Sequence, residues 1–373
     1  MEDIKMTATK AQYAKLKPEL DAAFSTVMAS MSMEEGPQQQ EFARSIATFQ
    51  QVQHAIPCAR GTDALELALL ALQLPAGAEV ILPAFCYEAL PEVIMKLNLK
   101  PVFADVDSRT FTLSPAAAER MITAATAAMV PVHLFGQCAP MQELTELAQK
   151  YNLWLLEDVA QALGAVYVDK DEKEWRAGAI GHMGYTSFFP TKPSADFGEG
   201  GAVFTGDAEL AERMQQIARD GMGGKYTFSA RLQNLQAAML DVKIRYLDEY
   251  NEAREEIARF YDNAFAETKL VQAPQRATYS SHTYHQYTIK VAPALRDGLQ
   301  QHLSDNFIPS VVYYPQPLHL LEKYTLAGYL PGELPVAELL SQSALSLPLH
   351  SELKEDQLAY ICQHVIDYVK QNR

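Results

Sequence analysis

The sequence predicts an α/β domain built on a mostly parallel sheet, followed by a smaller α+β domain. From about residue 50, segments with apolar residues at helical spacing alternate with short apolar runs. Strands separated by single helices need right-handed crossovers, which give a parallel sheet covered on both faces. The length of 373 residues also exceeds the usual size of one domain. We therefore expect a large domain over residues 1–246 and a small C-terminal domain over residues 247–373.

The elements of the large domain follow one another in regular alternation. Ser114 and Pro115 are typical of a helix start, because serine caps the first turn and proline fits the first helical position. Helices are expected at residues 61–74, 90–99, 112–122, 139–152 and 207–221, and strands at residues 78–85, 100–107, 127–136, 153–160, 184–190 and 200–206.

The rest of the sequence predicts a helical connection and a second domain. Residues 231–268 read as one long helical stretch, and the domain boundary is expected within it, near Leu247. Beyond it, strand-like patterns at 282–291 and 308–314 flank a helical pattern at 296–306. This mixture predicts a small α+β domain.

Composition excludes several classes of protein. The net charge of −15 disfavours binding to nucleic acid, which needs clustered Lys and Arg. No apolar run is long enough to cross a bilayer, and the N-terminus lacks the apolar core of a signal peptide, so we expect a cytoplasmic protein. The four cysteines are widely spaced, which favours reduced, buried thiols over a zinc site or a disulfide framework.

Ligands of parallel sheets bind beyond the carboxyl ends of the strands, so polar residues at those places are candidates for a site. Gly61, Thr62 and Asp63 open a helix whose free amides suit a phosphate, although Thr and Asp are also ordinary helix caps. Asp158 ends an apolar strand, where a carboxylate needs a cationic partner unless it only caps the next turn.

The stretch "SFFPTKPSADFGEGG" places Lys192 between an apolar strand and a glycine-rich loop. Most lysines are solvated surface charges. A desolvated lysine is instead nucleophilic at neutral pH and can bond to a carbonyl, and Ser187 could offer a hydroxyl to the same ligand. Tyr87 follows another strand end, where its ring could lie on a planar ligand or simply join the core.

A phosphate site, a carboxylate for a ring nitrogen, an aromatic face and a lysine for an aldehyde together match pyridoxal 5'-phosphate (PLP). The rival nucleotide motifs fail, because no G-x-G-x-x-G follows an early strand and "GMGGKY" lacks the spacing of a P-loop. His282 and His285 could suggest a metal, but no carboxylate or cysteine cluster accompanies them and a strand would point them to opposite faces.

These motifs resemble the DegT/DnrJ/EryC1/StrS aminotransferases, which aminate keto sugars attached to nucleotides. The resemblance runs over nearly the whole chain and includes "GTDALELALLAL", "PAFCYEA", "VPVHLFGQ", "LLEDVAQALGA", "SFFPTK", "GEGGAV" and "RLQNLQAAML". It implies an aspartate aminotransferase-like fold (PLP fold type I) and a homodimer with active sites shared between subunits.

The resemblance also implies roles for single residues. Lys192 matches the lysine that bonds to the cofactor and moves protons, and Asp158 matches the carboxylate that pairs with the ring nitrogen. Gln161 matches a side chain that reaches the ring oxygen. The phosphate cradle is matched by Gly61, Thr62, Asp63 and Ser187, and the stacking aromatic by Tyr87. Ser229 stands where the family usually has an asparagine that reaches the neighbouring subunit's phosphate, and Arg60 replaces the usual Ser or Asn before Gly61.

We therefore expect a PLP-dependent aminotransferase that moves an amino group from an amino acid, usually glutamate in this family, to a nucleotide-linked keto sugar. Two alternatives stay open at this point. The acceptor could be a cyclitol ketone, because the family includes aminocyclitol aminotransferases. The chain could also be a non-catalytic PLP-binding regulator, although no DNA-binding module is visible in the sequence.

Overall fold

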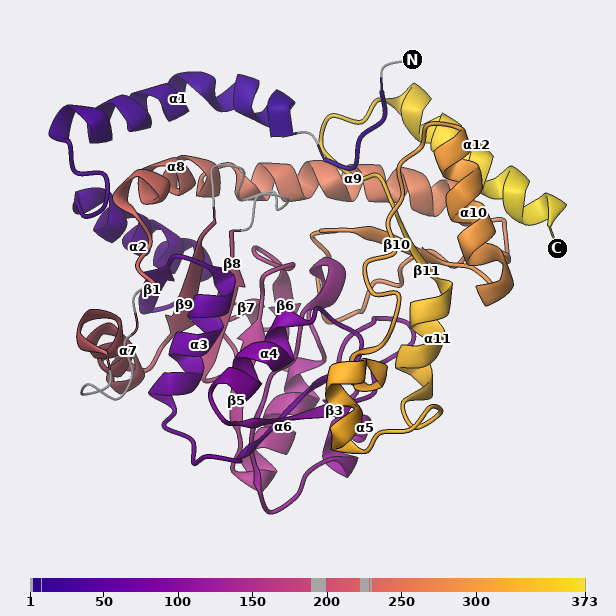
Figure 1. Cartoon of the computed structure of the whole chain (residues 1–373). Coiled ribbons are helices and arrows are strands. Elements are labelled where there is room, and N and C mark those ends of the chain that lie inside the picture. Colours follow the sequence, from indigo (N-terminus) through magenta and orange to yellow (C-terminus); the bar gives the residue numbers. More distant parts are fainter. Residues whose placement is uncertain (1–2, 8, 189–198, 222–227, 229, 373) are drawn as a thin grey trace.

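A seven-stranded sheet forms the centre of the computed structural model, which describes residues 3–7, 9–188, 199–221, 228 and 230–372 (Figure 1). In these residues the strand order is β1-β9-β8-β5-β4-β2-β3. All neighbours are parallel except β9, which is antiparallel to both β1 and β8. The prediction of an α/β fold with a mostly parallel sheet is confirmed. The strands are β1 (His54–Cys58), β2 (Glu79–Pro83), β3 (Lys100–Ala104), β4 (Thr126–Met129), β5 (Trp154–Asp158), β8 (Met183–Ser187) and β9 (Gly201–Thr205).

Helices cover both faces of this sheet. Side chains alternate along a strand, so Val80 and Leu82 of β2 belong to the same apolar cluster as Leu65 of α3, whereas Ile81 between them belongs to the cluster that includes Leu144 of α6. The helices of this part of the chain are α1 (Thr9–Ser30), α2 (Pro37–Gln50), α3 (Gly61–Ala71), α4 (Ala89–Lys96), α5 (Pro115–Arg120), α6 (Met141–Tyr151), α7 (Ala208–Asp220) and α8 (Asn234–Ile244), with the 3-10 turn η1 (Leu134–Gly136) and the hairpin β6 (Val166–Val168) and β7 (Glu174–Arg176).

Side-chain caps begin α5, where Ser114 was expected to cap the first turn, and α7. The Ser114 hydroxyl accepts a hydrogen bond from the Ala117 amide at 3.3 Å, with Pro115 at the first position of α5. Asp207 caps α7 in the same way, because its carboxylate accepts bonds from the amides of Glu209 and Leu210 at 2.8 and 3.0 Å. Such caps satisfy amides that have no partner inside the helix.

The C-terminal part of the chain has its own sheet and apolar cluster. Figure 1 shows α9 running across the top of the main sheet toward α10 and α12. Tyr261, Tyr287, Leu299 and Ile361 belong to one buried cluster, separate from the clusters on the two faces of the main sheet. The elements are α9 (Leu247–Phe265), β10 (Tyr287–Lys290), α10 (Pro293–Asp305), η2 (Leu318–Leu320), η3 (Glu322–Ala327), α11 (Pro335–Ser343), β11 (Ala344–Leu347) and α12 (Glu355–Gln371), and β10 pairs with β11 in antiparallel orientation. The division into domains at residues 246 and 247 stays a prediction.

Three expected elements differ in the structure. The stretch 231–268 contains two helices, because α8 ends at Ile244 and Tyr246 leaves helical geometry before α9. The expected strand 308–314 forms only an isolated bridge between Val311 and Ser346, since prolines at both ends remove ladder donors. The expected strand 127–136 stops at Met129, two residues before Pro131.

Cys58, Cys86, Cys138 and Cys362 are all buried and free, in agreement with the expected buried thiols. No helix in the described ranges combines the length and apolarity that a membrane span requires.

Candidate active site

The carboxyl ends of β2, β5 and β8 and the start of α3 meet at one cavity. Its volume is about 320 Å³. Five residues expected from the sequence, Gly61, Thr62, Tyr87, Gln161 and Ser187, lie in its wall. The other described lining residues are Leu65, Ala89, Ala160, Tyr185, His285, Gln286 and Tyr313. The structure thus brings together residues that lie up to 252 positions apart in the sequence, which is the separation of Gly61 from Tyr313.

Gly61 is required at the start of α3 because Ser187, at the end of β8, approaches it closely. A Cβ at this position would lie 2.3 Å from the Ser187 Cβ and 2.8 Å from the Ser187 hydroxyl oxygen. Arg60 stands before the helix in extended conformation and makes no side-chain cap. The first amides of α3 have no acceptor within the helix, and the helix dipole adds positive potential there. The helix start and the Ser187 hydroxyl therefore suit an anion.

Asp63 lies in the same turn but is not among the described residues that line the cavity. Burial, followed by the charge of Glu66, raises the pKa of its half-buried carboxyl group. Its membership of a phosphate cradle, expected from the family resemblance, stays a prediction.

Asp158 is the last residue of β5 and is only 1% exposed. Its Oδ1 accepts a hydrogen bond from the Ala160 amide at 2.9 Å. Its Oδ2 accepts bonds from the hydroxyls of Tyr185, at 2.8 Å, and of Tyr87. The donors that the described residues supply to this buried carboxylate are all neutral, so it can take a further cationic donor.

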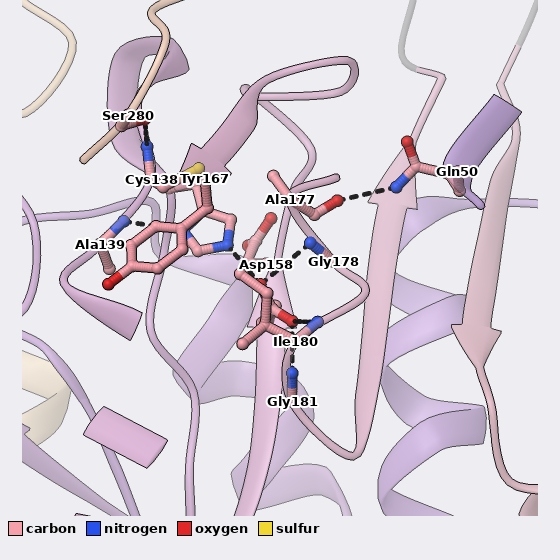
Figure 2. A network of polar contacts seen from close by, with 12 residues as sticks. Gln50, Cys138, Ala139, Asp158, Tyr167, Ala177, Gly178, Ile180, Gly181 and Ser280 are labelled. Carbon is pink, nitrogen blue, oxygen red and sulfur yellow. Dashed lines mark hydrogen bonds and ion pairs between the residues drawn. The ribbon is translucent and has the colours of Figure 1, made fainter. Parts of the chain in front are cut away.

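The backbone around Asp158 is fixed by a second buried network on the neighbouring residue (Figure 2). The Glu157 carboxylate, fully buried, accepts bonds from the amides of Gly178, Ile180 and Gly181 at 2.9, 2.6 and 2.6 Å. His133 Nε2 lies 2.9 Å from the same carboxylate, and Nδ1 accepts the Ala139 amide at 2.9 Å. Because Nδ1 accepts, Nε2 carries the proton and donates to Glu157. Glu157 thus anchors β5, and Asp158, which is not itself among the described lining residues, bonds to two residues that line the cavity, Tyr87 and Tyr185.

Gln161 is oriented by contacts at both ends of its amide. Its Oε1 accepts the Phe135 amide at 2.8 Å, and its Nε2 donates to the Tyr314 hydroxyl at 3.0 Å. An amide nitrogen has two hydrogens and the described residues accept only one of them, so the other is available to a ligand in the cavity. This agrees with the role that the family resemblance implies.

Lys192 and Ser229, both expected at the site, lie outside the described residues. The metal alternative for His282 and His285 gains no support, because the described residues contain no group of three or more His, Cys, Asp or Glu side chains placed to hold a metal. His282 instead stacks on Tyr284, with ring centroids 3.9 Å apart, and His285 lines the cavity.

Sequence reasoning missed Tyr185, His285, Gln286 and Tyr313. Tyr185 could have been found, because it lies two residues before Ser187 on one strand and so points to the same face. The other three residues come from distant loops, for which the sequence offers no local signal.

Comparison with known proteins identifies the family. The model of the DegT/DnrJ/EryC1/StrS aminotransferase family matches residues 14–366. The chain is 38% identical to a pleiotropic regulatory protein of Geobacillus stearothermophilus, with 99% of both chains covered. It is 35% identical to the UDP-2-acetamido-2-deoxy-3-oxo-D-glucuronate aminotransferase of Pseudomonas aeruginosa, with 95% of this chain and 97% of that one covered.

Solved structures agree in fold. DesV of S. venezuelae, in complex with a ketimine intermediate, superimposes with a TM-score of 0.92 at 34% identity, with 99% of both chains covered. NtdA of Bacillus subtilis, solved with the bound cofactor PMP, gives a TM-score of 0.87 at 26% identity over 96% of this chain and 82% of that one. The chain therefore belongs to the DegT/DnrJ/EryC1/StrS aminotransferase family and has its fold.

Proposed function

We propose that the protein transfers an amino group from an amino acid, expected to be glutamate, to a keto sugar linked to a nucleotide, with PLP as cofactor. The observation that supports this most directly is the buried carboxylate of Asp158, bonded to two residues in the wall of the cavity where α3 begins. The aminotransferase of Pseudomonas aeruginosa, by its name, acts on a UDP-linked keto sugar.

The described residues fit PLP. The start of α3 and the Ser187 hydroxyl would bind the phosphate, and the close approach of Gly61 to Ser187 keeps these donors together. Asp158 would hold the proton on the ring nitrogen, and the free Nε2 hydrogen of Gln161 would reach the ring oxygen.

When bound, PLP supplies an electron sink for the pair released as a proton leaves the substrate carbon. The chain's own part is to hold and move protons. Asp158 keeps positive charge on the ring nitrogen, and the Lys192 amine is the expected base at the substrate carbon. We also infer a homodimer in which Ser229 lies near the neighbouring subunit's site.

The test compares Lys192→Ala with the control Lys170→Ala, which removes a surface lysine whose side chain is 66% exposed. Purified wild-type protein and the control should bind PLP with a visible absorbance band and convert it to PMP with glutamate. Lys192→Ala should lose the band and turnover. A wild-type protein that gains no visible band with added PLP would refute the proposal.

The acceptor is identified by a panel of nucleotide-linked keto sugars together with a keto-inositol. Amination of the keto-inositol alone would favour the aminocyclitol alternative.

A PLP-binding regulator is the second candidate, favoured by the 38% identity to the pleiotropic regulatory protein of Geobacillus stearothermophilus. Bound PLP that glutamate and a panel of other amino acids fail to convert to PMP would support it over the aminotransferase.

A further inference from the structure

At the end of β5, two hydroxyl groups of residues that line the cavity meet the carboxylate of Asp158. The Tyr185 hydroxyl lies 2.8 Å from Asp158 Oδ2 and 3.0 Å from the Tyr87 hydroxyl, which also bonds to Oδ2. Tyr185 is 2% exposed and Asp158 is 1% exposed. Two phenols therefore converge on the one carboxylate oxygen.

Both phenols are donors. Burial, with the nearby charge of Asp158, raises the pKa of Tyr87 and of Tyr185 well above the usual value. Among the described residues, the charge of Asp158 also acts on Cys86 and Tyr314, and burial raises the pKa of each. These four groups are neutral at physiological pH, so none of them cancels the charge of Asp158.

The orientation of the carboxylate does not depend on Tyr185. The Ala160 amide holds Oδ1, and the backbone of Asp158 is bonded on both sides, from its amide to the Pro131 carbonyl at 2.9 Å and from the His133 amide to its carbonyl at 3.0 Å. What Tyr185 adds is a hydrogen bond that stabilises the negative charge on Oδ2.

We propose that Tyr185 is a positioning residue that acts through Asp158. Its hydroxyl donates a hydrogen bond to Oδ2, the oxygen that would also bind the protonated ring nitrogen of the cofactor. This bond lowers the affinity of the carboxylate for the ring proton. This inference rests on the proposed PLP site. Without the cofactor, the Tyr185 hydroxyl donates to a charged carboxylate; with it, the ring nitrogen neutralises much of that charge. Since hydrogen bonds to charged groups are stronger than those to neutral groups, the Tyr185 bond is stronger in the protein without the cofactor. Removing the hydroxyl therefore destabilises the free protein more than the complex.

The test uses PMP labelled with ¹⁵N in the ring, bound to wild-type protein and to Tyr185→Phe. In the variant the PMP dissociation constant should fall by about 2- to 10-fold. The ring ¹⁵N resonance should move toward the value of the protonated ring. A purely structural role predicts the opposite change in affinity, since a damaged site binds more weakly.

The matched control is Tyr261→Phe. Tyr261 is fully buried and its hydroxyl donates to the Pro348 carbonyl at 2.8 Å, in the C-terminal cluster away from the cavity. This variant should leave the ¹⁵N resonance and the PMP affinity unchanged. Incorporation of 3-fluorotyrosine at position 185, which makes the phenol a stronger donor, should move the resonance in the direction opposite to Tyr185→Phe.

Weaker PMP binding by Tyr185→Phe, or an unchanged ring resonance in both position-185 variants, would overturn the inference and leave the proposed function standing. Failure of the wild-type protein to bind PMP would overturn both.

Discussion

Replacing Gly61 with alanine tests whether the approach of α3 to β8 builds the phosphate site. The new Cβ would lie 2.3 Å from the Ser187 Cβ, whereas carbon atoms in contact are separated by about 3.5–4.0 Å. The start of α3 or the end of β8 must therefore move by about 1 Å. Overpacking of this kind costs about 1–3 kcal/mol, and the lower entropy of unfolded alanine offsets about 0.4–1 kcal/mol of it.

A shift of this size should matter more for the cofactor than for folding. Each charge-assisted bond to the phosphate that is lost should cost about 1.5–3 kcal/mol, which is a 10- to 100-fold rise in the PLP dissociation constant. Titration of the variant with PLP measures this change, and urea denaturation measures stability.

Gly206→Ala is the matched control, because a Cβ at Gly206 meets no described atom within 4 Å. It should bind PLP as the wild type does. The double variant Gly61→Ala, Ser187→Gly removes the contact with the Ser187 Cβ but keeps the Cα of residue 187 at 3.1 Å. Its free energy of unfolding should therefore recover in part. If Gly61→Ala binds PLP with the affinity of the wild type, the start of α3 does not bind the phosphate of the cofactor.

Two further predictions concern buried histidines. His133→Ala removes a donor from the fully buried Glu157 carboxylate and should lower the free energy of unfolding by about 1.5–3 kcal/mol, measured by urea denaturation; an unchanged midpoint would contradict the network. Burial lowers the pKa of His282 from 6.5 to about 3, so its protonation favours the unfolded chain: stability is full above pH 6.5 and falls as the pH drops toward 3. By pH 5 the loss from this group should be about 2 kcal/mol, and His282→Phe should show a smaller loss between pH 7 and 5 than the wild type.

The parts of the site that the sequence predicts are those defined by local pattern. Asp158 and Ser187 end apolar strands and Gly61 opens a helix, so the rule for parallel sheets places all three at one edge. Gln286 could not be predicted, because it belongs to the C-terminal part of the chain and only tertiary packing brings it to the cavity. The break at Tyr246 escaped prediction for a similar reason, since the helical pattern of residues 231–268 is continuous in sequence.

The charge of the protein makes the local donors of the cavity decisive. The net charge of −15 opposes a phosphorylated ligand, and none of the described lining residues is a lysine or an arginine. In the proposed site, the attraction that the described residues offer a phosphate would come from the dipole and first amides of α3 and from the Ser187 hydroxyl. Backbone amides remain hydrogen-bond donors at every pH. Phosphate binding at the start of α3 should therefore depend little on pH between 6 and 9. The exception is the second ionisation of the phosphate itself, which has a pKa of about 6. A steep loss of affinity for inorganic phosphate within that range would show that a titrating side chain holds the anion instead.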